Sequence, residues 1–280
     1  MRPPRDDIGA PEFPHSLSWL DAAPGSMAEL TAAGPVLVHF IDYAQLNSVR
    51  TLPYLREWKR RYGDLGLSVI LVQTPRLAFG AEPDAARAAG RRLALEMPIA
   101  LDADRALWRD YGCEGWPSLF LWAQGGALHW FHFGEGEYRA TEEAIQAELR
   151  EVDALRKLPA PLAPVRPSDA PGAKVIAPTP ELFPAENRAW TAKRDEAGLT
   201  VEYEGAGAHV TVEGKGRLRS RLDGTALAPV EVPGPGLYTL AEHETHGRHT
   251  IEIRLDGKVA LWAVSFSPGV PAAAATASPR

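Results

Sequence analysis

The first 158 residues alternate between short apolar runs and segments with helical spacing. Val36–Ile41 is rich in apolar and β-branched residues and follows Gly34-Pro35, a pattern typical of a buried strand. Leu55, Trp58 and Tyr62 recur at helical spacing, so we expect a helix over 47–62. The same criteria predict strands at 67–72, 99–101, 118–122 and 128–133, and helices at 83–95, at 104–111 and from an N-cap at Thr141. This order predicts an α/β domain over 34–158, with a mixed sheet flanked by helices and a hairpin near its end.

Beyond residue 180 the period of apolar and polar positions changes to two. Asp223-Gly224 and Asp256-Gly257 stand between alternating runs and are expected to form hairpin turns. Short strands are predicted at 200–204, 209–213, 217–222, 250–255 and 259–266. Strands of this length and spacing are typical of a small all-β sandwich, jelly-roll-like in type, which we expect over 181–267.

Composition marks the remaining boundaries. The segment 159–180 contains seven prolines and has no hydrophobic period, so it is expected to be a semi-rigid extended linker. Residues 1–33 are expected to be an N-terminal extension. The Ala- and Pro-rich end, 268–280, is expected to be a flexible tail.

Charge and hydropathy limit the partners. The chain has 280 residues, 45% of them apolar and 24% charged, which is the composition of a soluble globular protein rather than a disordered one. Its net charge of −6 argues against nucleic acid as a partner. No apolar stretch approaches the roughly 20 residues of a membrane span. No apolar core follows the basic residues of the start, so no secretory signal is expected and the predicted location is the cytoplasm.

Cysteine content is the most restrictive feature. Cys113 is the single cysteine in the sequence. An internal disulfide, a zinc site with several thiolates and an intramolecular dithiol cycle are therefore excluded.

Several separated motifs resemble one known family. They are the segment Phe40–Pro53, the pair Trp116-Pro117 before a predicted strand, and His132–Tyr138 after the hairpin. Together they resemble the thioredoxin-like region of bacterial DipZ-type proteins, which are relatives of TlpA and of AhpC/TSA-type thioredoxins. Segments of the second half, Thr179–Leu182 and His249–Glu252 among them, look like the family's carbohydrate-binding-module-like sandwich. The resemblance implies a thioredoxin-like fold, a cis peptide bond before Pro117, and relatives that act outside the cytoplasm.

The chain departs from this family at the redox site. The family carries Cys-x-x-Cys at the junction of strand and helix, where this sequence has Gln45 and Ser48. Thiol–disulfide exchange needs a thiolate at the helix N-terminus and a second thiol that resolves the mixed disulfide. Gln45 has no ionisable group, and the hydroxyl of Ser48 has a pKa far above that of a thiol. We therefore expect a degenerate site that runs no dithiol exchange.

The other candidate residues each have an ordinary structural alternative. Cys113 could act as a lone thiol or be an inert buried residue. Trp116-Pro117, with an exposed apolar strip formed by Tyr43 and Leu46, could bind an extended peptide. Sugar binding is considered for Trp190 and Trp262, although such aromatic residues more often fill a sandwich core. His243, His246 and His249 stand three residues apart in an expected loop. This spacing fits neither the zincin helix pair nor a zinc finger, so neither a metal nor another cofactor is predicted.

Three classes of function remain open from the sequence. The first is a scaffold without redox activity that binds a protein or peptide through the former active site. The second is an oxidoreductase or peroxidase-like enzyme that uses Cys113 with an external thiol. The third is a protein that binds glycans or the cell envelope through the sandwich. Loss of both family thiols favours the first class.

Overall fold

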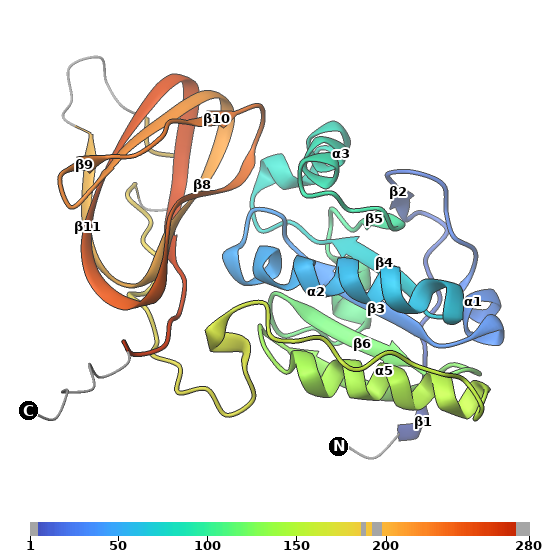
Figure 1. The fold of residues 1–280 in the computed structure, drawn as a ribbon. Coiled ribbons are helices and arrows are strands. Elements are labelled where there is room, and N and C mark those ends of the chain that lie inside the picture. The colour runs from blue at the N-terminus through green and yellow to red at the C-terminus, as the bar shows by residue number, and fades with distance from the viewer. Residues whose placement is uncertain (1–4, 186–188, 192–197, 273–280) are drawn as a thin grey trace, which may run out of the picture. The chain divides into compact units, whose positions relative to one another are not determined.

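The computed structural model describes residues 5–185, 189–191 and 198–272. The chain forms two compact units, Met1–Val165 and Arg166–Arg280, which are called unit 1 and unit 2 (Figure 1). Each unit has its own hydrophobic core and is described by itself.

Unit 1 is built on a seven-stranded mixed sheet. The strand order is β1-β7-β6-β3-β4-β5-β2. The adjacent strands β3, β4 and β5 are parallel to one another, whereas β6 and β7 form an antiparallel hairpin, in which β6 pairs with β3. The strands are β1 (Arg5–Gly9), β2 (Ser18–Trp19), β3 (Val36–Ile41), β4 (Ser68–Gln73), β5 (Ile99–Leu101), β6 (Ser118–Trp122) and β7 (Ala127–Phe133).

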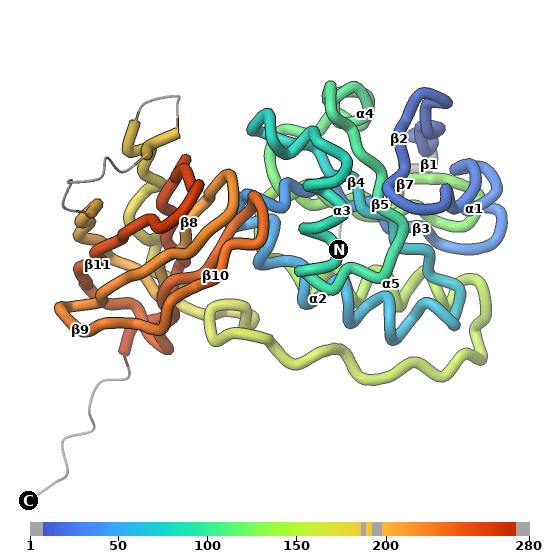
Figure 2. The backbone as a smooth tube through the Cα atoms, turned by 90° about the horizontal axis from the view of Figure 1, so that it is seen from above, coloured from blue at the N-terminus to red at the C-terminus, as the bar shows by residue number. Residues whose placement is uncertain are grey.

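Helices cover both faces of this sheet. Because side chains alternate along a strand, β3 directs Val38 and Phe40 to the face packed against Met27 of α1 and Leu107 of α4. The opposite face is covered by α2 and α5, which lie side by side (Figures 1 and 2). The helices are α1 (Met27–Ala33), α2 (Leu46–Tyr62), α3 (Pro83–Arg92), α4 (Ala106–Asp110) and α5 (Tyr138–Val152).

The expected α/β order is present, with two local differences. The segment that was expected to be an extension contributes both edge strands, since β1 pairs with β7 and β2 pairs with β5. Helix α5 begins at Tyr138, so Thr141 lies inside its first turns and is not the N-cap. The buried Thr141 hydroxyl instead accepts a hydrogen bond from Trp130 Nε1, at 3.1 Å. A core contact, which local sequence does not encode, therefore decides the role of this threonine.

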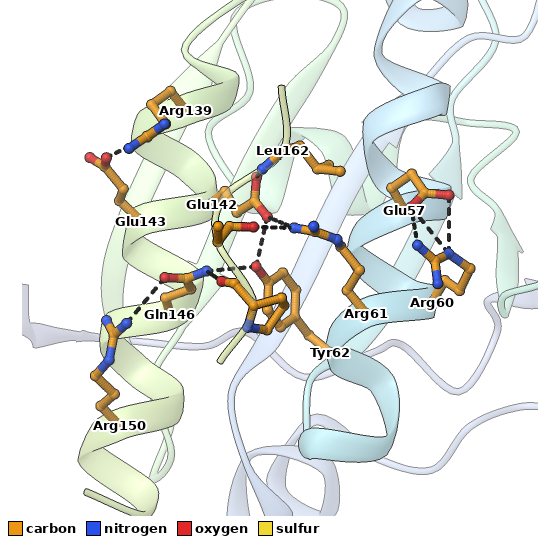
Figure 3. A network of polar contacts seen from close by, with 12 residues as sticks. Glu57, Arg60, Arg61, Tyr62, Arg139, Glu142, Glu143, Gln146, Arg150 and Leu162 are labelled. Atoms are coloured by element: carbon orange, nitrogen blue, oxygen red, sulfur yellow. Dashed lines mark hydrogen bonds and ion pairs between the residues drawn. The ribbon is translucent and has the colours of Figure 1, made fainter. Parts of the chain in front are cut away.

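The Pro-rich segment is not a single free linker. Its first residues, 159–165, pack on unit 1, where the carboxylate of Glu142 on α5 holds them (Figure 3). Glu142 is 1% exposed and accepts hydrogen bonds from Arg61 Nη1 at 2.8 Å and from the Tyr62 hydroxyl at 2.6 Å. Its second oxygen accepts the main-chain N–H of Leu162 at 2.8 Å. A buried carboxylate is stable only when so paired, and here the pairing fixes the chain after α5.

Further contacts extend this anchorage along the segment. The side chain of Gln146 donates to the Pro159 carbonyl at 2.8 Å, and Arg61 donates to the Ala160 carbonyl at the same distance (Figure 3). At the far end Val165 N–H donates to the Tyr54 hydroxyl at 2.8 Å. A proline-rich backbone has few N–H donors for its own carbonyl groups, so side chains of α2 and α5 supply the hydrogen-bond partners.

Unit 2 is all-β, with two long strands that curl around one core. The strands are β8 (Leu199–Leu222), β9 (Thr225–Ala226), β10 (Val230–Val232) and β11 (Gly236–Phe266). Both halves of β11 pair with β8, so that Val212 lies opposite Gly236 along one edge and opposite Leu261 along the other. The enclosed core includes Val210, Leu218 and Ile251, each with no exposed surface.

The expected short strands of unit 2 are therefore segments of longer ones. Asp223-Gly224 turns between β8 and β9 as expected, but Asp256-Gly257 lies within β11 and forms no hairpin. The second part of the Pro-rich segment belongs to this unit, because Ile176 bridges to Gly269. Residues 273–280 of the expected tail lie outside the described residues.

Candidate functional site

The site is formed where β3 passes into α2. Gln45 is the N-cap of α2, and its side-chain oxygen accepts the Ser48 main-chain N–H at 2.7 Å. Ser48 has no exposed surface, and its hydroxyl oxygen accepts the Asp42 N–H at 3.1 Å. The side chains of Gln45 and Ser48 thus pair with main-chain N–H groups around the helix start.

The predicted cis peptide bond between Trp116 and Pro117 is present and confirms that expectation. Ser118 pairs with Phe40 in the antiparallel ladder of β6 and β3, so Trp116 stands at the same edge of the sheet as Asp42. Across the described residues, neither the main-chain N–H nor the carbonyl of Trp116 has a hydrogen-bond partner. An extended peptide could pair with these two groups as an added strand does.

The indole of Trp116 is held on three sides. Its Nε1 donates to the Thr74 carbonyl at 2.8 Å, and the ring stacks on Trp108 with centroids 5.1 Å apart. The guanidinium carbon of Arg105 lies 5.4 Å from the ring centroid, within the range of a cation–π contact. The half-buried ring is therefore fixed in place, and α4 supplies its stacking partner.

The expected exposed apolar strip is absent. Tyr43 is 3% exposed and Leu46 is 5% exposed, so the expectation was wrong for both side chains. The Tyr43 hydroxyl donates to the Phe79 carbonyl at 3.3 Å, and its main-chain N–H donates to Gln73 at 3.0 Å. The loop after β4 covers Tyr43, a long-range contact that residues 40–53 do not encode.

Two buried aspartates, which the motif analysis did not single out, shape the loops around the site. Asp42 accepts main-chain N–H groups from Ala44 and Arg76 at 2.9 and 3.0 Å. Asp102 accepts the N–H groups of Leu107 and Trp108 at the start of α4. Burial raises the pKa of both carboxyl groups, and these hydrogen bonds act in the opposite direction. In the sequence, each of these two residues could have been found as an aspartate that directly follows an apolar strand.

Cys113 lies in the core of unit 1. It is 6% exposed, and burial raises its pKa to about 12. A thiol acts as a nucleophile through its thiolate, which this environment disfavours at neutral pH.

His39 lies beneath the helix start but is not placed as a base. It is buried, and its Nε2 lies 3.0 Å from the Thr51 hydroxyl, which donates to the Ser48 carbonyl. Burial lowers the pKa of His39 to about 3, and His132 adds to the effect. A neutral imidazole bonded to a helix hydroxyl supports α2 and does not activate Ser48.

The candidate sugar-binding residues of unit 2 do not form one platform. Trp190 pairs with Leu261 in an isolated bridge and packs against the core. Trp262 lies at a break in the register between β11 and β8, and its Nε1 donates to Glu213 at 3.0 Å.

The three spaced histidines lie within β11 and not in the expected loop. His243 and His249 are brought together, and His246 is not part of that contact. Within the described ranges no three His, Cys, Asp or Glu side chains converge on a position for a metal ion.

The sheet order of unit 1, the helix that begins directly behind β3 and the cis-proline turn at the same edge define a thioredoxin-like protein. No protein-family model matches the chain. The chain is 31% identical over 202 residues to Protein DipZ of Mycobacterium bovis and of Mycobacterium tuberculosis, a match that covers 71% of this chain. It is thus a DipZ-type thioredoxin-like protein over the matched region. The same match covers 27% of the length of DipZ.

Two further comparisons each cover 50% of this chain. The chain is 28% identical over 139 residues to Protein SUPPRESSOR OF QUENCHING 1, chloroplastic, of Arabidopsis thaliana, which covers 50% of this chain and 13% of that protein. Among solved structures, a thiol-disulfide isomerase from Corynebacterium glutamicum aligns with a TM-score of 0.43 and 19% identity, covering 50% of this chain and 96% of that one. None of the helices in the described residues has the length and apolar character needed to span a membrane.

Proposed function

We propose that unit 1 is a thioredoxin-like scaffold without redox activity that binds an extended polypeptide at the former active site. The observation that carries the proposal is how Gln45 and Ser48 are used. Gln45 caps α2, and Ser48 accepts the Asp42 N–H in the loop before the helix, at the two positions where thiol exchange would need cysteines. The helix start therefore offers no nucleophile to a disulfide.

The peptide-binding part of the proposal rests on the cis-proline turn. The unpartnered main-chain groups of Trp116 lie at the edge of the sheet beside the helix start. Main-chain pairing of this kind accepts many sequences, and neighbouring side chains then select among them. The fixed ring of Trp116 is the first such neighbour.

The use of Cys113 as a lone catalytic thiol is less favoured. Its burial and raised pKa oppose attack on an external disulfide or peroxide. Glycan binding through Trp190 and Trp262 is also less favoured, because Trp190 packs against the core and the Trp262 ring is bonded to Glu213.

Redox activity is tested by reduction of insulin with dithiothreitol as the electron source. The full chain should not accelerate the reaction above the rate without protein. Turnover that disappears in Cys113→Ser would overturn the proposal and favour the lone-thiol enzyme.

Peptide binding is tested on the full chain with a photo-cross-linking residue in place of Asn47, which is half-buried beside the cap. A library of random ten-residue peptides supplies the ligand, and mass spectrometry identifies what is captured. The matched control carries the same residue in place of Arg139, whose side chain is 51% exposed on α5. Equal capture at the two positions would reject the site.

A further inference from the structure

Two imidazole rings of unit 2 stack face to face. The ring centroids of His243 and His249 are 3.9 Å apart, with an angle of 16° between the planes, and we call this pair the histidine stack. Both residues belong to β11. The register of β11 against β8 breaks between Glu242 and Gly247, so residues 243–246 form a bulge in the strand. The stack therefore joins the bulge to the regular strand that follows it.

Each ring also has an oxygen partner outside β11. The Tyr203 hydroxyl on β8 lies 2.9 Å from His243 Nε2, and Asp223 Oδ2 lies 2.8 Å from His249 Nδ1. Tyr203 is 2% exposed and stacks on Phe266 at 4.6 Å, so the stack rests on the core of the unit. Burial raises the pKa of Tyr203, and the protonated hydroxyl can donate to a neutral His243.

The two rings differ in the charge that faces them. Asp223 pairs with His249, and that hydrogen bond is the main reason why the pKa of Asp223 is lowered. His243 has Tyr203 as its hydrogen-bond partner. Its pKa is lowered first by burial and then by His249, and the charge of Asp223 acts more weakly in the opposite direction. The other titratable groups around the bulge are Glu242, Glu244 and His246 of β11, with the pair of Arg248 and Glu204 across β11 and β8. No hydrogen bond joins any of these to His243 in the described part of the chain.

We propose that the histidine stack is an acid-sensitive latch, which holds the 243–246 bulge against β8 at neutral pH and releases it when both rings are charged. One proton is compatible with the stack, because Asp223 balances it on His249. A second proton places two like charges face to face, with no carboxylate hydrogen-bonded to His243.

The direction of the pH effect follows from the lowered pKa of His243. A closed bulge binds fewer protons than an open one, where His243 has an ordinary pKa. The latch is therefore fully effective above the ordinary histidine range of about 6.5, and weakens as the pH falls through that range. The pKa of Asp223 is also lowered, so protonation of this carboxylate at still lower pH would weaken the latch as well.

Hydrogen exchange of the full chain, read by mass spectrometry, tests the latch. Protection of peptides that span 239–250, corrected for the intrinsic effect of pH on exchange, should fall at least about tenfold from pH 7.5 to pH 5. Peptides from the core strand segment 208–212 should keep their protection. Protection of 239–250 that does not change with pH would overturn the proposal.

A variant separates the stack from general acid sensitivity. His243→Gln keeps an acceptor for Tyr203 but cannot be charged, so the fall in protection of 239–250 should disappear. His246→Gln, in the same bulge but outside the stack, is the matched control and should behave as the natural protein does. An undiminished fall in His243→Gln would reject the latch.

Should His243→Gln not fold, proton NMR of the natural chain provides an independent test. The pKa of His243 is lowered in the closed bulge, so its ring should stay neutral well below the ordinary histidine range. Titration of His243 near the ordinary value of about 6.5 would contradict the proposal.

Discussion

At the scale of single residues, Gln45 and Ser48 show how side chains pair with the main-chain N–H groups around a helix start. A helix start has four main-chain N–H groups without a partner inside the helix. Gln45 accepts one of them, and Ser48 accepts the N–H of Asp42 in the preceding loop. Both side chains thus stabilise the backbone around the start of α2.

This role gives a first prediction. Gln45→Ala should lower the free energy of unfolding by about 1 kcal/mol, because the Ser48 N–H loses its acceptor. Gln45→Asp should retain most of the stability, since a carboxylate also caps a helix. Asn47→Ala, a half-buried neighbour in the same turn, should change it by less than about 0.5 kcal/mol. Urea unfolding measures all three, and a loss in Asn47→Ala equal to that in Gln45→Ala would contradict the cap.

Cys113 gives a second prediction. A pKa of about 12, against about 8.5 for a free cysteine, lowers the thiolate fraction at pH 8 by roughly a thousandfold. Alkylation by iodoacetamide should therefore be at least about 100-fold slower in the folded chain than in urea. Mass spectrometry follows the reaction, and similar rates in both states would show that the folded thiol is accessible and reactive.

Short local motifs predict the residue types of the site, but they do not predict which of its side chains are buried. The lack of cysteine at positions 45 and 48 and the cis bond before Pro117 could be predicted from short motifs, since each depends on residues close together in the chain. The burial of Tyr43 depends on the loop at Phe79, about 36 residues away. For the same reason the sequence did not reveal that Asp42 reaches Arg76.

At the scale of elements, unit 1 follows its hydrophobic pattern more closely than unit 2. Strands β5 and β6 begin and end where the pattern places them. In unit 2 the alternation of apolar residues predicted strands correctly. It also predicted a turn at Asp256-Gly257, a pair that often forms hairpin turns, although β11 continues through both residues. Pairing of these residues with Arg217 and Gly216 on β8 overrides the local turn preference.

The contact between α2, α5 and the segment 159–165 gives a third prediction (Figure 3). Glu142→Ala should lower the free energy of unfolding of unit 1 by about 3 kcal/mol, because Arg61, Tyr62 and Leu162 lose a buried acceptor. Cleavage within 159–165 by a nonspecific protease should also become faster.

The adjacent residue is a matched control for that substitution. Glu143 is 49% exposed and pairs with Arg139 on the surface of the same helix. Glu143→Ala should change the stability by less than about 0.5 kcal/mol and leave proteolysis of 159–165 unchanged. Similar effects of the two substitutions would mean that the segment is not held by Glu142.

At the scale of the whole molecule, the chain combines a thioredoxin-like unit with an all-β unit and spans about a quarter of the length of DipZ, 27% of it. Unit 1 has kept the sheet order, the helix behind β3 and the cis-proline turn. At the start of that helix the sequence has Gln45 and Ser48, and both side chains pair with main-chain N–H groups there.

If the scaffold is otherwise complete, returning the thiols should return the activity. Gln45 is half-buried at the helix start and Ser48 is fully buried one turn on, the arrangement needed for an attacking thiol and a resolving one. The double substitution Gln45→Cys with Ser48→Cys should therefore reduce insulin, with dithiothreitol as electron source, at least about tenfold above background. Gln45→Cys alone lacks the resolving thiol and should form mixed disulfides without turnover. A folded, inactive double variant would place the loss of activity outside these two positions, with His39 and the buried carboxylate of Asp42 beneath the helix start as the next groups to exchange.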